Sequence, residues 1–269
     1  MRFKRLLPFI WALGLVATAS AHDLFLKLDT YFLQPNSKVT VRLLNGTFTA
    51  SEGRVAPERL RDVLVIGSDA RKSGADSVAW RDEGQTTLME FETGAPGTYA
   101  AAISTKPREI GLKAAQFNNY LQHDGIPDVL AARRKQGELG KDVRERYSKH
   151  VRALFQVGDK RTDEYKTALN YPVEIIPQQN PYALKLGQML PVLCTLDGKP
   201  LRNQYVIAGW ADRHGKLHEL TTRSDRSGIA RFKLSSAGKW FVKFIHMEPI
   251  REPGLNYESK WATLTFEMR

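Results

Sequence analysis

Short, largely hydrophobic segments rich in β-forming residues recur in the first and last parts of the chain, a pattern typical of β-strands. In the first part of the chain we expect strands at residues 24–27, 39–45, 62–66, 86–92 and 98–105. In the last part we expect them at residues 189–196, 204–211, 229–234, 239–246 and 261–268. Turn sequences such as Asp197-Gly198 separate the segments, because Gly accepts a positive φ and Asp bonds its own backbone. Short strands at this spacing predict antiparallel sandwiches.

The segment between these two β-rich parts has the spacing of helices. One helix is predicted around apolar positions that recur every three or four residues, namely Val143, Tyr147, Val151 and Leu154. Another is predicted to start at Ile126-Pro127, since proline is tolerated in the first turn of a helix.

These patterns together predict a mainly β protein. We expect an N-terminal β-sandwich at residues 22–111, a helical insertion at 112–170 and a C-terminal β-sandwich at 171–269. The rhythm of turns and strands in both β-rich parts is that of immunoglobulin-like or transthyretin-like domains.

Residues 1–21 predict a secretory signal peptide. A positively charged start is followed by a mostly apolar stretch at residues 6–16 and then by Ala19-Ser20-Ala21, the small residues at which signal peptidase cuts. The apolar stretch is shorter than the roughly 20 residues of a membrane-spanning helix, and no later stretch is apolar enough to span a bilayer. We therefore expect a periplasmic or secreted protein whose mature chain begins at His22.

The net charge and the absence of known catalytic and nucleotide-binding motifs limit the classes of function that we expect. Loss of the three positive charges in residues 1–21 lowers the formal net charge from +11 to +8. Lysines and arginines alternate with acids instead of clustering, so we expect no nucleic-acid partner. No motif for nucleotide binding, serine hydrolysis or zinc proteolysis is present, so we expect no catalytic residues. The single cysteine, Cys194, lies in an apolar segment and is expected to be a small buried residue.

An N-terminal histidine has particular chemistry. The free α-amino group and the ring Nδ1 of His22 would close a chelate ring on one metal ion, and the amino pKa near 8 lets a metal displace its proton at neutral pH. One further imidazole would complete a three-nitrogen set that suits Cu(II) or Ni(II), of which Cu(II) binds more tightly. The alternative is that His22 stands at the cleavage site by chance and has no ligand role.

Other side chains could complete this site. We expect His246 to give the second imidazole, because it ends an apolar strand, and Glu248 follows it as a further candidate ligand. His123 is another candidate, with Asp124 able to orient its ring; each of these histidines could equally be a structural residue. Weaker candidates are His150, His214, His218, Tyr147 and the carboxylates of Asp23 and Glu258, which we expect to be exposed.

An ordered set of short segments resembles an exported bacterial family that is largely uncharacterised. Its members are described as domains of unknown function or as periplasmic components of nickel-uptake or cobalt-type ABC transporters. The matching segments cover nearly the whole mature chain: residues 21–27, 43–48, 96–99, 117–121, 146–150, 245–247 and 261–266. The resemblance implies a β-rich periplasmic protein with a role in nickel or cobalt handling.

Three hypotheses follow. The first is a carrier or accessory protein for nickel, cobalt or copper that works with an inner-membrane transporter component. The second is a binding or structural β-sandwich without metal, which recognises an envelope glycan or protein through its helical insertion. The third is a copper enzyme that activates dioxygen at the N-terminal histidine, as polysaccharide monooxygenases do.

Overall fold

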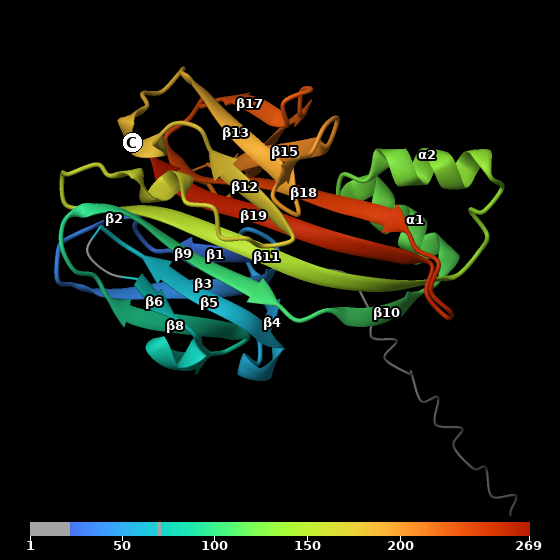
Figure 1. Ribbon diagram of the computed structural model, residues 1–269, viewed down its shortest axis with the longest axis horizontal. Helices are drawn as coiled ribbons and strands as arrows, with labels where there is room; N and C mark the ends of the chain where they lie inside the picture. Colours follow the sequence, from blue (N-terminus) through green and yellow to red (C-terminus); the bar gives the residue numbers. More distant parts are fainter. Residues whose placement is uncertain (1–21, 69–70, 213) are drawn as a thin grey trace, which may run out of the picture.

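The computed structural model describes residues 22–68, 71–212 and 214–269, so the signal peptide expected at residues 1–21 lies outside the described residues. Two α-helices, α1 (Ala114–His123) and α2 (Pro127–Lys135), lie together at one end of a mainly β molecule (Figure 1). Short 3-10 turns occur at Pro57–Arg59, Ala75–Ser77, Asp163–Lys166 and Pro181–Ala183. Neither α-helix of the described chain combines the length and apolar character needed to cross a membrane.

Within the residues that the structure describes, three sheets form the layers of the molecule. The first contains β1 (Asp23–Leu28), β3 (Lys38–Gly46), β8 (Thr86–Glu92) and β7 (Ala79–Glu83) in that order, with β4 (Ser51–Gly53) paired to β3. The last contains β12 (Val173–Pro177), β13 (Met189–Leu196) and β14 (Lys199–Pro200), with β17 (Ile229–Lys233) paired to β13. Both cover faces of a larger central sheet.

The central sheet joins strands from both ends of the sequence. In the described part of the chain its order is β16 (Leu217–Arg223), β15 (Tyr205–Ala211), β18 (Gly238–Pro249), β19 (Tyr257–Met268), β11 (Val143–Val157), β9 (Gly97–Thr105), β5 (Leu60–Ile66) and β6 (Arg71–Ser73). β10 (Arg108–Leu112) and β2 (Phe32–Leu33) also pair with β11. β19 runs antiparallel to β18 but parallel to β11, so this sheet is mixed.

A main hydrophobic core lies on each face of the central sheet, and smaller clusters lie beneath the helices and around Phe241. Side chains of successive residues point to opposite faces of a strand, and on β11 Leu154 enters the core beneath β12, β13 and β17, whereas Ala153 and Phe155 enter the core beneath β1, β3 and β8. Figure 1 shows the two covering sheets on opposite sides of β11 and β19. The mainly β sandwich architecture predicted from the sequence is therefore confirmed, and the two sandwiches share their middle layer.

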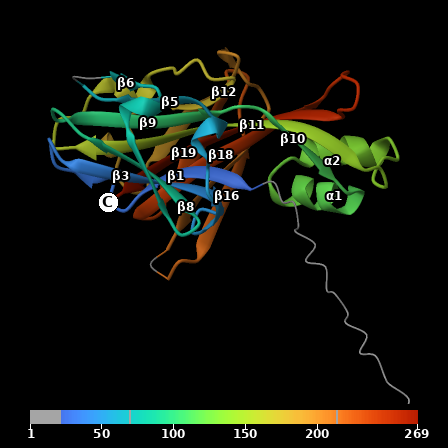
Figure 2. The same cartoon turned by 90° about the horizontal axis from the view of Figure 1, so that it is seen from below.

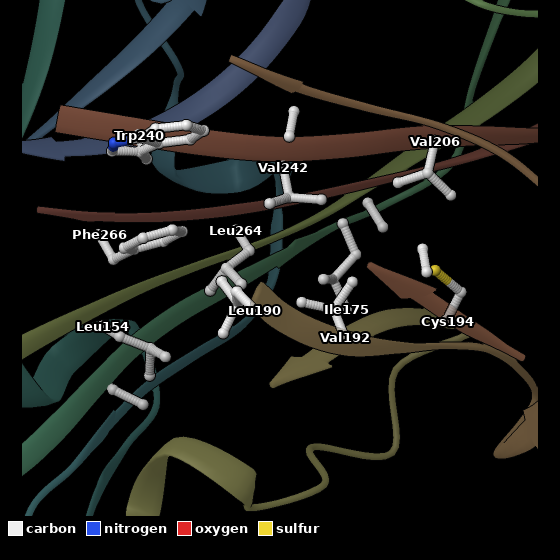
Figure 3. Packing of buried hydrophobic residues seen from close by; sticks show 14 of the residues in the cluster. Leu154, Ile175, Leu190, Val192, Cys194, Val206, Trp240, Val242, Leu264 and Phe266 are labelled. Atoms are coloured by element: carbon white, nitrogen blue, oxygen red, sulfur yellow. The ribbon is translucent and has the colours of Figure 1, made fainter. Parts of the chain in front are cut away.

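The core beneath β13 shows how the expected buried cysteine is used. Cys194 is completely buried, and burial raises the pKa of its thiol to about 12. In Figure 3 Cys194 lies in one apolar cluster with Val192 of the same strand and Val206 of β15 in the central sheet. It is a small packing residue, as the sequence predicted.

The helix predicted around Val143, Tyr147, Val151 and Leu154 is wrong, because these residues lie on the long strand β11. β11 is almost continuously buried from Ser148 to Val157, since it is covered on both faces. A strand covered on both faces loses the alternation that would identify it, so the chance spacing of four apolar residues gave a helical period. The other predicted helix is confirmed as α2, which has Pro127 in its first turn.

The helices pack against the end of the central sheet. Phe117, Tyr120 and Leu121 of α1 are buried against Trp261 and Tyr257 of β19, and the Tyr120 and Trp261 rings stack 5.6 Å apart. Figure 2, seen from below, shows α1 and α2 beside the ends of β10 and β11. This packing places the C-terminal end of α1 close to the start of β1.

Candidate functional site

His22 precedes β1 and lies at the border of two cavities. The larger cavity has a volume of about 470 Å³, and its ionisable lining consists of His22, His123, Lys243 and four carboxylic acids, Asp23, Glu52, Asp124 and Glu219. We call it the acidic cavity. The second has a volume of about 180 Å³, and the charged side chains that line it are Arg54, Arg59, Arg108 and Lys149. We call it the basic pocket.

The start of β1 is fixed by hydrogen bonds to the central sheet. Thr263 and Thr265 of β19 donate their hydroxyl protons to the carbonyl oxygens of Leu24 and Leu26, over 2.8 Å and 2.5 Å. The buried ammonium of Lys149 donates to the carbonyl oxygen of His22. Its second acceptor is Oδ1 of Asn45, 3.2 Å away. The backbone at residue 22 is therefore held in one place.

A second buried lysine, Lys243, forms an ion pair with Asp23, the residue after His22. Nζ of Lys243 on β18 lies 2.5 Å from Oδ2 of Asp23 and 3.7 Å from Oδ1 of Asp124. Both Lys243 and Asp23 are less than 10% exposed, so Asp23 is buried and not exposed as the sequence suggested. Asp23 can be buried because Lys243 replaces water as its partner, and burial of a carboxylate is unfavourable unless it is paired.

The electrostatics of this cluster are set by burial and by its neighbours. Burial acts to lower the pKa of Lys243, but the Asp23 and Asp124 carboxylates outweigh it and raise that pKa. Burial raises the pKa of Asp124 to about 6, although Lys243 opposes the shift. Burial also lowers the pKa of Lys149 to about 8. Shifted pKa values of this kind occur where ionisable side chains are buried near other charges, an arrangement that is common at functional sites.

Both histidines of the acidic cavity are accessible. Nδ1 of His22 lies 3.3 Å from Oε2 of Glu52, and the His22 side chain is 26% exposed. His123 is the last residue of α1, and its side chain is exposed. Three aromatic rings at the side of this cavity, Phe25, Phe48 and Phe241, pack edge to face or tilted, with centroids 4.9–5.4 Å apart. The cavity thus has a rigid apolar wall beside its ionisable groups.

His246 and Glu248 lie elsewhere. His246 lines a different cavity of about 210 Å³, next to Gln204, whose Oε1 lies 3.4 Å from the ring Nδ1. Its Nε2 is buried without a hydrogen-bond partner and lies 3.9 Å from Oε2 of Glu248. Lys243 and His246 are three residues apart on one strand, so they point to opposite faces. Since Lys243 points to Asp23, the strand geometry turns His246 away from the acidic cavity.

The other candidate histidines have local partners. His150 is buried between two serine hydroxyls, with Nδ1 2.9 Å from Oγ of Ser104 and Nε2 3.0 Å from Oγ of Ser148, and burial lowers its pKa to about 3. His218 stacks on Trp210 and lies 3.0 Å from Oδ2 of Asp212. Among the described residues no group of three or more His, Cys, Asp or Glu side chains is arranged to hold a metal ion. A metal at His22 would therefore need its main-chain amino group as a ligand.

The cations that organise this region were not predicted from the sequence. Lys243 interrupts the otherwise apolar strand segment 240–245, and this was the one signal that could have identified it. A charged residue inside an apolar strand is rarely buried unless it is paired. Arg59 and Lys149 stood in less apolar surroundings and gave no such signal.

Comparison with known proteins gives the family but no function. Solved structures that match the chain include the D0-D1 domain of intimin (13% identity, 91% of this chain and 98% of that chain, TM-score 0.22) and a two-domain fibronectin type III segment of chicken tenascin (10% identity, 92% and 98%, TM-score 0.23). A tandem-repeat segment of a large adhesion protein is also similar (14% identity, 92% and 50%, TM-score 0.21). These similarities support no functional argument.

A comparison with curated proteins finds no match. The family profile of DUF4198, a domain of unknown function, matches residues 19–248, which is most of the sequence. The chain therefore belongs to the DUF4198 family.

Proposed function

We propose that this protein is a periplasmic carrier or accessory protein for a divalent transition metal, and that the metal is nickel, cobalt or copper bound at His22. The observation that carries the proposal is that His22 and His123 line one cavity together with four carboxylic acids. Carboxylates lining a partly enclosed cavity attract cations and raise their local concentration.

The donors in this cavity suit such a metal. Cleavage after Ala21 would give His22 a free amino nitrogen, which with Nδ1 forms a bidentate chelate. His123 is the second imidazole in this proposal, in place of His246, because it lines the same cavity. Glu52, which lies 3.3 Å from Nδ1 of His22, either exchanges with the metal or becomes an oxygen ligand. Nitrogen-rich sets of this kind favour Cu(II) and Ni(II).

The fixed position of residue 22 supports the same proposal. The bonds from Lys149 and Lys243 to residues 22 and 23 keep the start of the mature chain from fraying. A chelating residue that is already held in place loses little conformational freedom on binding. A carrier also needs an accessible site for transfer to an inner-membrane transporter component, and both imidazoles are at least partly exposed.

The test starts with secreted protein whose N-terminus is verified by intact mass. We expect a mass that corresponds to residues 22–269, and binding of Cu(II), Ni(II) or Co(II) tighter than micromolar in calorimetric titrations. His123→Ala should weaken binding at least about tenfold, since it removes a ligand. His246→Ala serves as the matched control and should bind like the parent. Nitrogen hyperfine structure in the copper EPR spectrum should decrease in His123→Ala alone.

Two results would contradict the proposal. One is a mature chain that begins at a residue other than His22, because the amino-terminal chelate would then not exist. The other is the absence of binding tighter than micromolar for all three metals, which would favour an envelope-binding or structural role without metal. Oxidation of ascorbate with release of peroxide by the copper-loaded protein would instead indicate the copper enzyme.

A further inference from the structure

The basic pocket contains cations without matching acids. Its charged lining consists of Arg54, Arg59, Arg108 and Lys149, and no aspartate or glutamate lines it. The remaining polar lining includes the hydroxyl of Thr105 and the ring of Tyr147. In a chain with many surface ion pairs, a concave site with cations alone is a distinct local feature.

Most of these cations have no ion-pair partner within the described residues. Arg59 and Arg108 form no ion pair there, and Nε of Arg59 is buried without a hydrogen-bond partner. Lys149 is 5% exposed, and in the described part of the chain its ammonium donates only to neutral oxygens, those of His22 and Asn45. The carboxylates of Asp23, Asp124 and Glu145 lie close enough to raise its pKa, but burial outweighs them. Arg54 does form an ion pair, with Asp82 at 3.4 Å, but more than half of its side chain is exposed.

Aromatic rings give these cations partial compensation. The guanidinium carbon of Arg59 lies 5.8 Å from the centre of the Tyr147 ring, and Nζ of Lys149 lies 5.7 Å and 5.5 Å from the Tyr147 and Trp261 rings. A ring face stabilises a cation less than a counter-ion does. Buried cations without a counter-ion are unfavourable. An anion that enters the pocket would therefore form the ion pairs and hydrogen bonds that these cations lack within the protein.

We propose that the basic pocket binds a small oxyanion, through carboxylate or phosphate oxygens held by Arg59, Arg108 and Lys149. The planar guanidinium groups match two oxygens of one carboxylate or phosphate at once. Lys149 adds a buried positive charge at the inner end, and Thr105 a hydroxyl group. This site does not depend on a metal at His22, although His22 also borders the pocket.

The experiment measures binding of citrate and of inorganic phosphate by calorimetry at low ionic strength. The secreted protein is first treated with EDTA and dialysed, so that no chelated metal contributes. We expect one site for at least one of the two anions, and the tighter of them identifies the chemical source. Added sodium chloride should weaken binding, because it screens the exposed part of the pocket.

Variants separate the pocket from general charge. Arg108→Gln removes an exposed side chain, so the fold is expected to be unaffected, and Arg59→Gln removes the partly buried one; each should weaken binding about tenfold or more. Arg134→Gln, an exposed arginine of α2 outside the pocket, is the matched control and should bind like the parent. Circular dichroism checks that each variant is folded.

Three results would overturn the proposal. They are the absence of binding of either anion at millimolar concentration, unchanged binding in Arg108→Gln and Arg59→Gln, and equal weakening in Arg134→Gln, which would indicate attraction by net charge alone. His123→Ala should leave anion binding unchanged. Failure of the metal proposal would therefore be seen in the metal titrations, and failure of the oxyanion proposal would be seen in the citrate and phosphate titrations.

Discussion

Glu145 allows a quantitative prediction of how stability depends on pH. It lies on β11, is completely buried, and its Oε1 accepts hydrogen bonds from the hydroxyls of Tyr120, at 3.2 Å, and Ser259. Its Oε2 is buried without a partner. Burial raises the pKa of this carboxyl from its ordinary 4.5 to about 7, despite the two hydrogen bonds. The protonated form is therefore the one that the fold accommodates.

Proton linkage decides whether Glu145 makes the fold more or less stable as pH rises. Below pH 4.5 the carboxyl is protonated in both the folded and the unfolded chain, and Glu145 contributes no pH dependence. Between pH 4.5 and 7 the unfolded chain ionises first, so the free energy of unfolding decreases as pH rises. Each unit of pKa difference corresponds to about 1.4 kcal/mol. The total loss is therefore roughly 3 kcal/mol, of which about 2.5 kcal/mol falls between pH 5 and pH 8.

Glu145→Gln should abolish this loss, because an amide has nearly the shape of the protonated acid and does not ionise. Urea unfolding followed by tryptophan fluorescence gives the free energy of unfolding of parent and variant at pH 5 and pH 8. The variant should gain about 2.5 kcal/mol relative to the parent on going from pH 5 to pH 8. Glu109→Gln, an exposed glutamate on β10, is the control and should show almost no such gain. An equal difference between Glu145→Gln and parent at both pH values would refute the reasoning.

Two further predictions concern buried ion pairs, both measured by urea unfolding at pH 7.5. Lys243→Met leaves Asp23 buried without its counter-ion and should destabilise the fold by about 3–5 kcal/mol. The double variant that also carries Asp23→Asn should recover most of that loss. A loss below about 1 kcal/mol in Lys243→Met would show that Asp23 finds another partner. Arg152→Met should cost a similar amount, about 3 kcal/mol, because Arg152 and Glu174 are each 4% exposed and lie 3.1 Å apart. A variant as stable as the parent would mean that Glu174 is sufficiently held by the backbone amides of Leu169 and Tyr171.

The strands that face solvent on one side could be predicted from the sequence, and the central strand could not. The segments predicted at residues 39–45 and 86–92 lie within β3 and β8, and in β3 the buried residues Val39, Val41 and Leu43 alternate with partly exposed ones. β11 is covered on both faces, and its apolar positions therefore carried no period of two. That one strand decides the architecture, because it joins the two sandwiches.

From the sequence, His22 could be predicted and His123 was one of several candidate partners, but which candidate shares a cavity with His22 could not be decided. His22 was identified by its position after the cleavage motif, which is a local signal. Its neighbours depend on how α1 docks and on which face of β18 meets β1, and neither follows from local spacing. For this reason His123 shares a cavity with His22, whereas His246, three residues after Lys243 on the same strand, points away.

The shared central sheet constrains when the chain can fold during synthesis. β19 lies between β18 and β11, and its parallel pairing with β11 joins residues 112 positions apart, such as Glu145 and Tyr257. Until β19 has emerged, one edge of β11 has no neighbour along residues 145–153, and the backbone hydrogen-bonding groups of that edge stay open. Open edges pair readily with other chains, and distant pairings form slowly. The N-terminal half is therefore expected to need protection from aggregation until the last strand is available.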